Sequence, residues 1–193
     1  MLTEVELTHR IAADIPASWR KLMASLPVGA AVIAGGAPRD LALGRPIKDI
    51  DIWTNEEGWG AIFDALNGDG SDCFRVSDAD SAPDEDTEIE RVWRFPAGME
   101  GLDVDLICVK EGVDAIGRFD FGICQAVYDG GIAIRVTGAF VRDRRDKTFT
   151  FLRPDRNDWQ RNISWKRWDR LKAKYPDYTL VGLAEPVKQG AAT

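Results

Sequence analysis

Two aspartates, Asp49 and Asp51, stand two residues apart at the start of an apolar segment, and they constrain this sequence more than any other feature. In a β-strand, side chains at positions i and i+2 point to the same face. Both carboxylates would therefore lie on one face, while Ile50 and Ile52 would pack into the core on the other. Two neighbouring oxygen ligands suit Mg²⁺, whose remaining positions phosphate oxygens and water can fill. The pattern predicts a strand that carries a metal site.

A pair of glycines, Gly35 and Gly36, precedes the aspartates within one continuous string, GGAPRDLALGRPIKDIDIWT, which runs from Gly35 to Thr54. Glycine has no side chain, so the backbone at these positions can come close to phosphate oxygens. A glycine turn followed by a pair of metal-binding carboxylates indicates metal-assisted chemistry on a nucleotide.

This string resembles the first motif of the DNA polymerase β-like nucleotidyltransferase superfamily, and within it the head domain of class II CCA-adding enzymes and bacterial poly(A) polymerases. Pro38 replaces the usual Val, and Pro is favoured at the start of a helix. The resemblance covers about residues 30–130. Small stand-alone phage-type or bacterial nucleotidyltransferases look nearer than full CCA enzymes, because their CQ, KTFT and KYP segments also occur here. The residues that match the first motif, with every spacing kept, are Gly35, Gly36, Arg39, Asp40, Gly44, Asp49, Asp51 and Thr54.

The resemblance implies a third carboxylate on a strand beside the first two. The segment LDVDLI supplies Asp105, between Val104 and Leu106, and Asp103 is the reserve choice because it would share the same face. A site of three carboxylates would bind two Mg²⁺ ions, one that activates an acceptor hydroxyl and one that holds the triphosphate. The alternative is that Asp105 is an ordinary exposed strand residue.

The resemblance also implies a set of nucleotide-binding residues. Gly35 and Gly36 would seat the triphosphate. Arg118 and Asp120, in RFDFGICQ, match part of a family motif that holds the ribose and phosphates, and a structural Arg–Asp pair is the alternative. The family element that selects the incoming base is not found, so no base preference carries over. The expected nucleotide-binding residues are Gly35, Gly36, Arg39, Asp40, Arg118 and Asp120.

Charge is distributed unevenly along the chain. The net charge of −7 divides into about −14 over residues 1–134 and about +8 over residues 135–174. An acidic head joined to a basic segment suits a metal site that faces a groove for an anionic substrate, and a solvated helix is the alternative. The basic residues Arg161, Lys166, Arg167 and Arg170 are candidates for contact with nucleic acid. We expect the same helix to pack on the head through Trp159, Ile163, Trp168, Leu171 and Tyr175.

Composition excludes several other classes of protein. A single histidine, His9, rules out a histidine-rich metal site and leaves little basis for a Ser-His-Asp mechanism. Cys73, Cys108 and Cys124 are widely spaced and suggest neither a disulfide framework nor a zinc site, so we expect a reducing cytoplasm. No apolar run is long enough to span a membrane, and the N-terminus lacks a signal-peptide pattern.

The hydrophobic pattern predicts helices and strands of an α+β fold with a basic C-terminal helix, and the resemblance implies a polymerase β-like arrangement with a mixed sheet flanked by helices. We expect a nucleotidyltransferase head domain over residues 1–152, and a helix and tail over 153–193 that pack on it. Residues 68–88 should contain a short strand and an acidic loop. Predicted helices span 16–26, 38–43, 56–66 and 155–174, and predicted strands span 30–34, 49–53, 88–95, 102–109, 119–129, 132–137 and 147–152.

Together these features predict a Mg²⁺-dependent nucleotidyltransferase that moves a nucleoside monophosphate from an NTP to a hydroxyl acceptor and releases pyrophosphate. The basic segment favours an RNA 3′ end, as in tRNA processing. Two alternatives stay open: an inactive binding protein with the same fold, and a toxin-like or antibiotic-modifying enzyme acting on a protein or a small molecule. The preferred NTP and the oligomeric state are left open.

Overall fold

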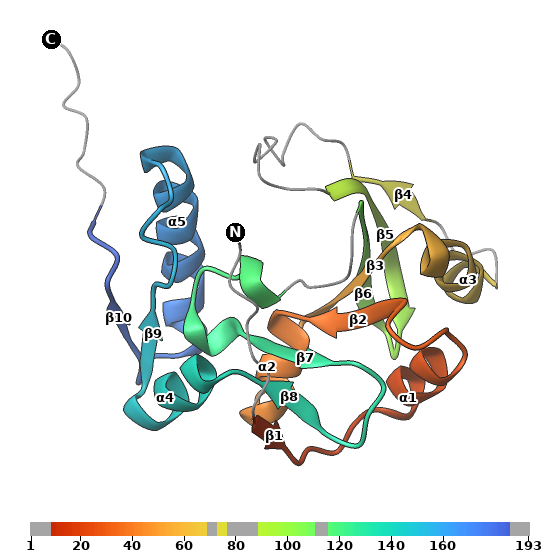
Figure 1. Ribbon diagram of the computed structural model, residues 1–193, viewed down its shortest axis with the longest axis horizontal. Helices are drawn as coiled ribbons and strands as arrows, with labels where there is room; N and C mark the ends of the chain where they lie inside the picture. Colours follow the sequence, from red (N-terminus) through yellow and green to blue (C-terminus); the bar gives the residue numbers. More distant parts are fainter. Residues whose placement is uncertain (1–8, 69–72, 77–88, 111–115, 186–193) are drawn as a thin grey trace, which may run out of the picture.

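One mixed β-sheet organises the molecule (Figure 1). The computed structural model describes residues 9–68, 73–76, 89–110 and 116–185. Strands β3 and β6 run parallel to each other, and the other neighbouring pairs in the sheet are antiparallel. In spatial order the strands are β1 (His9–Ile11), β8 (Ile134–Val136), β7 (Ala126–Tyr128), β2 (Ala31–Ala34), β3 (Asp49–Thr54), β6 (Leu102–Val109), β5 (Ile89–Met99) and β4 (Phe74–Arg75).

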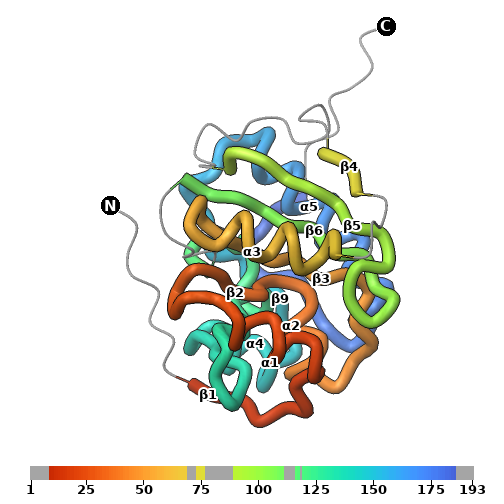
Figure 2. The backbone as a smooth tube through the Cα atoms, turned by 90° about the vertical axis from the view of Figure 1, so that its right-hand side faces the viewer, coloured from red at the N-terminus to blue at the C-terminus, as the bar shows by residue number. Residues whose placement is uncertain are grey.

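Helices cover one face of this sheet. The apolar side chains of α1 and α3 pack there against Ile33, Ile52 and Leu106, which belong to the main core. Figure 2 shows α3 running in front of β3, β5 and β6. The helices are α1 (Ala17–Ala24), α2 (Gly36–Ala42), α3 (Glu56–Asn67), α4 (Gly138–Asp146) and α5 (Asp158–Lys174), with two short 3₁₀ turns at Ile116–Arg118 and Gly122–Cys124.

The other face of the sheet is divided between apolar and acidic side chains. Val32, Trp53 and Ile107 form part of a second apolar cluster on it, and their neighbours Asp51 and Asp105 share the face because they lie two residues away along β3 and β6. This alternation explains why Ile50 and Ile52 are completely buried while Asp49 and Asp51, which alternate with them, are not. The period of two in the sequence therefore sets which face carries the carboxylates.

The expected fold class, α+β with a mixed sheet flanked by helices, is confirmed. The largest error in the extent of an expected strand is at residues 119–125, which contain a 3₁₀ turn, so that only Ala126–Tyr128 of the expected segment is a strand. The turn is stabilised by Asp143 of α4, which accepts a hydrogen bond from the backbone amide of Ile123 at 2.8 Å. Helix α4 and strand β1 were not predicted. The acidic stretch 77–88 lies outside the described residues.

The C-terminal segment packs on the rest of the chain. Beside α5, strand β10 (Thr179–Val181) pairs in parallel with β9 (Thr148–Thr150), which crosses the domain boundary expected after residue 152. That division into a head and a tail stays a prediction. Trp168 and Tyr175 are buried as expected, but Trp159 and Ile163 are 46 % and 36 % exposed, so the buried stripe is shorter than predicted. Within the described residues, no helix is long and apolar enough to cross a membrane.

Candidate active site

Parallel pairing of β3 with β6 brings the predicted carboxylates together. Asp49 faces Asp103 and Asp51 faces Asp105 across the two strands, so all four lie on the same face. The turn that follows β2 lies close to these carboxylates: an added Cβ at Gly35 would be 3.4 Å from Oδ2 of Asp51. Gly35 adopts φ +85°, a conformation that favours glycine, and this lets the backbone turn directly beside the carboxylate.

The charges on this face repel one another. Burial and, after it, the neighbouring carboxylates of Asp49 and Asp105 together raise the pKa of Asp51 to about 7. The guanidinium groups of Arg167 and Arg94 oppose this shift without cancelling it. An additional cation beside Asp51 would therefore stabilise its ionised form.

A pH dependence follows from the raised pKa of Asp51. Below about pH 7 the folded protein holds a proton on Asp51, so a divalent cation at this carboxylate would have to displace it and would bind more weakly as the pH falls. We expect the rise in Tm on adding Mg²⁺ to be larger at about pH 8 than at about pH 6, as measured by differential scanning calorimetry. In Asp51→Asn this difference should vanish. An equal Mg²⁺ effect at both pH values in the unaltered protein would contradict the assignment.

The candidate third carboxylate, Asp105, is already paired with an arginine. Arg94 of β5 donates from Nε and Nη2 to the two oxygens of Asp105, at 2.7 and 2.6 Å. Asp103, the reserve choice, is exposed and accepts a hydrogen bond from the backbone amide of Ala97 at 3.2 Å. Asp105 thus lies beside Asp51, whereas Asp103 is further out and helps to fix the β5–β6 turn.

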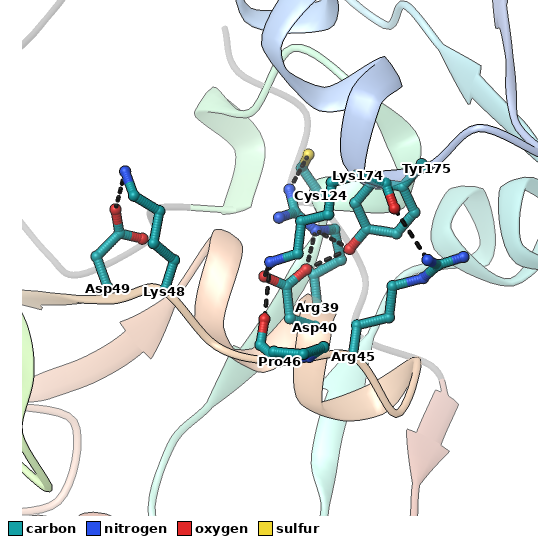
Figure 3. Close-up of polar contacts among 9 residues, drawn as sticks. All are labelled: Arg39, Asp40, Arg45, Pro46, Lys48, Asp49, Cys124, Lys174 and Tyr175. Atoms are coloured by element: carbon teal, nitrogen blue, oxygen red, sulfur yellow. Dashed lines mark hydrogen bonds and ion pairs between the residues drawn. The ribbon is translucent and has the colours of Figure 1, made fainter.

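Arg39 and Asp40 form a buried network with the C-terminal end of α5 (Figure 3). Nε of Arg39 donates to Asp40 at 2.8 Å and to the hydroxyl of Tyr175 at 2.9 Å. Asp40 also accepts hydrogen bonds from Tyr175 and Lys174. Figure 3 shows Asp49 and its partner Lys48 to one side of this network, and no dashed contact joins the two groups. Arg39 and Asp40 therefore connect α2 to the C-terminal end of α5.

Asp120 is also paired with α5. Its Oδ2 accepts hydrogen bonds from Nη1 of Arg167 at 2.5 Å and from the hydroxyl of Ser164 at 2.8 Å. The preceding residue, Phe119, places its ring 3.4 Å from the position of an added Cβ on Gly35. Asp120 and Arg167 are therefore at the border of the carboxylate face. The side chain of Arg118 lies outside the described part of the chain.

The basic residues of α5 have different surroundings. Lys166 and Arg170 are exposed, whereas Arg161 lies over the ring of Phe151, at 5.6 Å from its centroid. Arg167 is turned toward Asp120 rather than toward solvent alone. Of the four candidates for nucleic-acid contact, Lys166 and Arg170 are the two exposed residues.

Solved structures match this chain in fold, whereas no protein-family profile and no curated protein sequence matches it. A tRNA-processing enzyme in an apo form superposes with a TM-score of 0.61 and 16% identity over 89% of this chain and 45% of its own. A CCA-adding enzyme in complex with ATP superposes with a TM-score of 0.57 and 17% identity over 85% and 38%. The Thermotoga maritima CCA-adding enzyme complexed with tRNA gives 0.54 and 16% over 86% and 42%.

The chain therefore has the polymerase β-like nucleotidyltransferase fold. Identities this low establish the fold alone, and the chain spans less than half the length of these solved proteins. The resemblance inferred from the string between Gly35 and Thr54 is confirmed at the level of fold. The roles of individual site residues stay predictions.

Within this nucleotidyltransferase fold, the donors on the carboxylate face are of the type that a hard divalent cation takes. Asp49, Asp51 and Asp105 present carboxylate oxygens from two adjacent strands, the ligand type that Mg²⁺ takes. The raised pKa of Asp51 indicates that surrounding protein groups do not fully compensate the negative charge of these carboxylates. A bound cation would relieve this repulsion.

A second cluster of potential ligands lies on the opposite face of the sheet. Ligand atoms of Glu56, Glu90 and Cys108 lie within 4.8 Å of one another. Glu56 and Glu90 border a surface hollow of about 520 Å³ between α3 and β5, which Trp59 and Trp93 also line. Cys108 is even-numbered on β6, so it lies on the helix-covered face and not on the face of Asp105. Arg91 already pairs with Glu56 there, at 2.5 Å.

Sequence reasoning missed Arg94 and Tyr175 as neighbours of the predicted site. Arg94 occupies the strand position that faces Asp105, but the β5–β6 register that brings them together is interrupted by bulges and cannot be read from spacing. Tyr175 was expected only as part of an apolar stripe. Its hydroxyl meets Arg39 across 136 positions of sequence, a contact that no local pattern signals.

Proposed function

We propose that this chain is a Mg²⁺-dependent nucleotidyltransferase that moves a nucleoside monophosphate from an NTP to a hydroxyl acceptor, with an RNA 3′ end as the favoured acceptor. The observation that carries the proposal is the placement of Asp49, Asp51 and Asp105 on one face, directly beside the turn at Gly35. The polymerase β-like fold supports it, as do solved neighbours that are complexed with ATP or with tRNA.

Each site residue has a defined task in this reaction. Asp49 and Asp51 would hold the two Mg²⁺ ions, and Asp105 would provide a further ligand and accept the proton of the acceptor hydroxyl. Gly35 and Gly36 seat the triphosphate, because an added Cβ at either position would lie within 4 Å of an aspartate oxygen and would fill the space beside it. Bound Mg²⁺ supplies charge stabilisation for the attacking and leaving oxygens of an in-line displacement.

For the remaining candidates, the observed contacts favour supporting tasks. Arg39 and Asp40 act on the nucleotide by holding the turn at Gly36, since Nη2 of Arg39 would lie 3.7 Å from an added Cβ there. Asp120 shares Arg167 with the carboxylate face. Arg118 keeps the nucleotide-binding task that the family motif implies.

Transfer of label from α-labelled NTPs tests the proposal. Incubation of the protein with each of the four NTPs, Mg²⁺ and total cellular RNA should label RNA, and Asp49→Ala should abolish the labelling. Asp146→Ala, which alters an exposed aspartate of α4, is the matched control and should transfer label normally. The proposal is wrong if no NTP labels RNA, protein or small molecules in a complete cell extract.

The RNA acceptor is tested on the free face of α5. Lys166 and Arg170 lie one helical turn apart and are exposed, so replacing both by Gln should weaken RNA binding. Each lost phosphate contact should lower the slope of log affinity against log salt by about one. Arg145→Gln on α4 is the control, because Arg145 is exposed but pairs with Asp146. Unchanged RNA binding in the double variant, or label found in protein instead of RNA, would point to a different acceptor.

One observation favours the second candidate function, a binding protein that keeps the fold without catalysis. Arg94 and Arg167 form ion pairs with two of the candidate site carboxylates, Asp105 and Asp120. Calorimetric titration with an NTP distinguishes the two functions. A binding protein would take up the nucleotide equally well with and without Mg²⁺, whereas the proposed enzyme needs Mg²⁺ for tight binding.

A further inference from the structure

Arg94 holds a carboxylate that the proposed function requires as a metal ligand. Its guanidinium engages both oxygens of Asp105 in a forked contact, at 2.7 and 2.6 Å. The contact is built into the sheet, because residue 94 directly faces residue 105 in the antiparallel pairing of β5 with β6. A planar guanidinium matches a carboxylate at two points, which a lysine ammonium does not. Asp105 is therefore held in one orientation with both oxygens occupied.

These two oxygens are the ones that a cation at Asp105 must use. A guanidinium and a divalent cation repel each other, so each weakens the binding of the other to the same carboxylate. The side chain of Arg94 is 42 % exposed, whereas that of Asp105 is 17 % exposed. Arg94 can rotate away into solvent, while Asp105 stays beside Asp51 on the sheet.

We propose that Arg94 is a positioning residue of the metal site: it holds Asp105 until a divalent cation displaces it, and it thereby sets the cation concentration at which the site fills. The inference rests on the proposed function, since it requires Asp105 to be a metal ligand. Arg94 also compensates one negative charge on the carboxylate face, which limits the repulsion that the folded protein bears before the cation arrives.

Arg94→Gln tests this role through metal binding rather than through activity. The probe is Mn²⁺, whose binding to the complete, nucleotide-free chain is followed by electron paramagnetic resonance. Loss of a charge-assisted forked contact removes a competitor of the cation, so the dissociation constant of Mn²⁺ should fall by about tenfold. Arg94→Lys, which keeps the positive charge without the fork, should give a dissociation constant between those of Arg94→Gln and the unaltered protein.

Two further variants locate the effect. Arg135→Gln removes another strand arginine of similar exposure, 39 %, that pairs with Asp129 away from the carboxylates, and it should leave Mn²⁺ affinity unchanged. Asp51→Asn should lose Mn²⁺ binding, which shows that the probe reports on the carboxylate face. Thermal unfolding of each variant establishes that it is folded.

The possible outcomes separate the inference from the proposed function. Equal or weaker Mn²⁺ affinity in folded Arg94→Gln would overturn the role of Arg94 and leave the proposed function standing, because an arginine that only supports the sheet does not compete with a cation. Mn²⁺ binding that is undetectable in the unaltered protein and also in Arg94→Gln would overturn the metal site, and with it both proposals.

Discussion

Replacing Asp51 by Asn should abolish nucleotidyl transfer and at the same time make the metal-free protein more stable. The substitution keeps the shape of the side chain but removes one charge from a group of carboxylates that repel one another. Loss of metal-borne charge stabilisation should lower the transfer rate at least about a thousandfold. Relief of repulsion should raise the free energy of unfolding by about 1 kcal/mol and Tm by about 2–4 °C, measured without divalent cations.

Loss of activity together with a gain in stability would be diagnostic of a functional site. Charged groups that are held close together for activity repel one another and so lower the stability of the folded protein. Added Mg²⁺ should raise the Tm of the unaltered protein and leave that of Asp51→Asn unchanged. Asp14→Asn, an exposed aspartate outside the site, serves as the control and should alter neither activity nor the response to Mg²⁺. A less stable Asp51→Asn protein would mean that Asp51 is compensated by the protein itself.

Replacing Asp40 by Ala should destabilise the protein strongly. Asp40 is 2 % exposed and compensates Arg39, which is 6 % exposed, so its removal leaves a guanidinium buried without its carboxylate. Tyr175 and Lys174 lose an acceptor at the same time. Breaking a buried ion pair in this way costs about 3–5 kcal/mol, which corresponds to a fall in Tm of roughly 10 °C, measured by thermal or urea unfolding.

Asp40→Ala also distinguishes two roles of Asp40: a structural role in the buried network, and a direct role at the nucleotide, as the family motif implies. A variant with normal Tm and impaired NTP binding would show that Asp40 acts on the nucleotide directly. Tyr175→Phe distinguishes the network from its parts, because it removes one hydroxyl and keeps the buried ring. It should destabilise the protein less than Asp40→Ala, since Arg39 and Asp40 stay paired.

Much of the sheet could be predicted because its signals are local. The strands that bear Ile33, Ile52 and Leu106 begin and end within one residue of the predicted bounds, and the matching string from Gly35 to Thr54 indicated the superfamily fold. The segment 119–125 was misjudged because its apolar residues suggest a strand, whereas the backbone turns there to meet the carboxylate of Asp143. Hydrogen bonds to a side chain 20 positions away have no signature in periodicity.

Sequence alone determined which side chains share a face. The alternation at Asp49–Ile50–Asp51–Ile52 follows from the period of two in a strand, so the carboxylate face and the buried face are consequences of local geometry. Only the tertiary structure decided what those side chains meet. Arg94 reaches Asp105 and Tyr175 reaches Asp40 because strands and helices distant in sequence pack together, and burial makes each unpaired charge costly. The pairing of a carboxylate is therefore a property of the folded surroundings, while its position on a strand is a property of the chain.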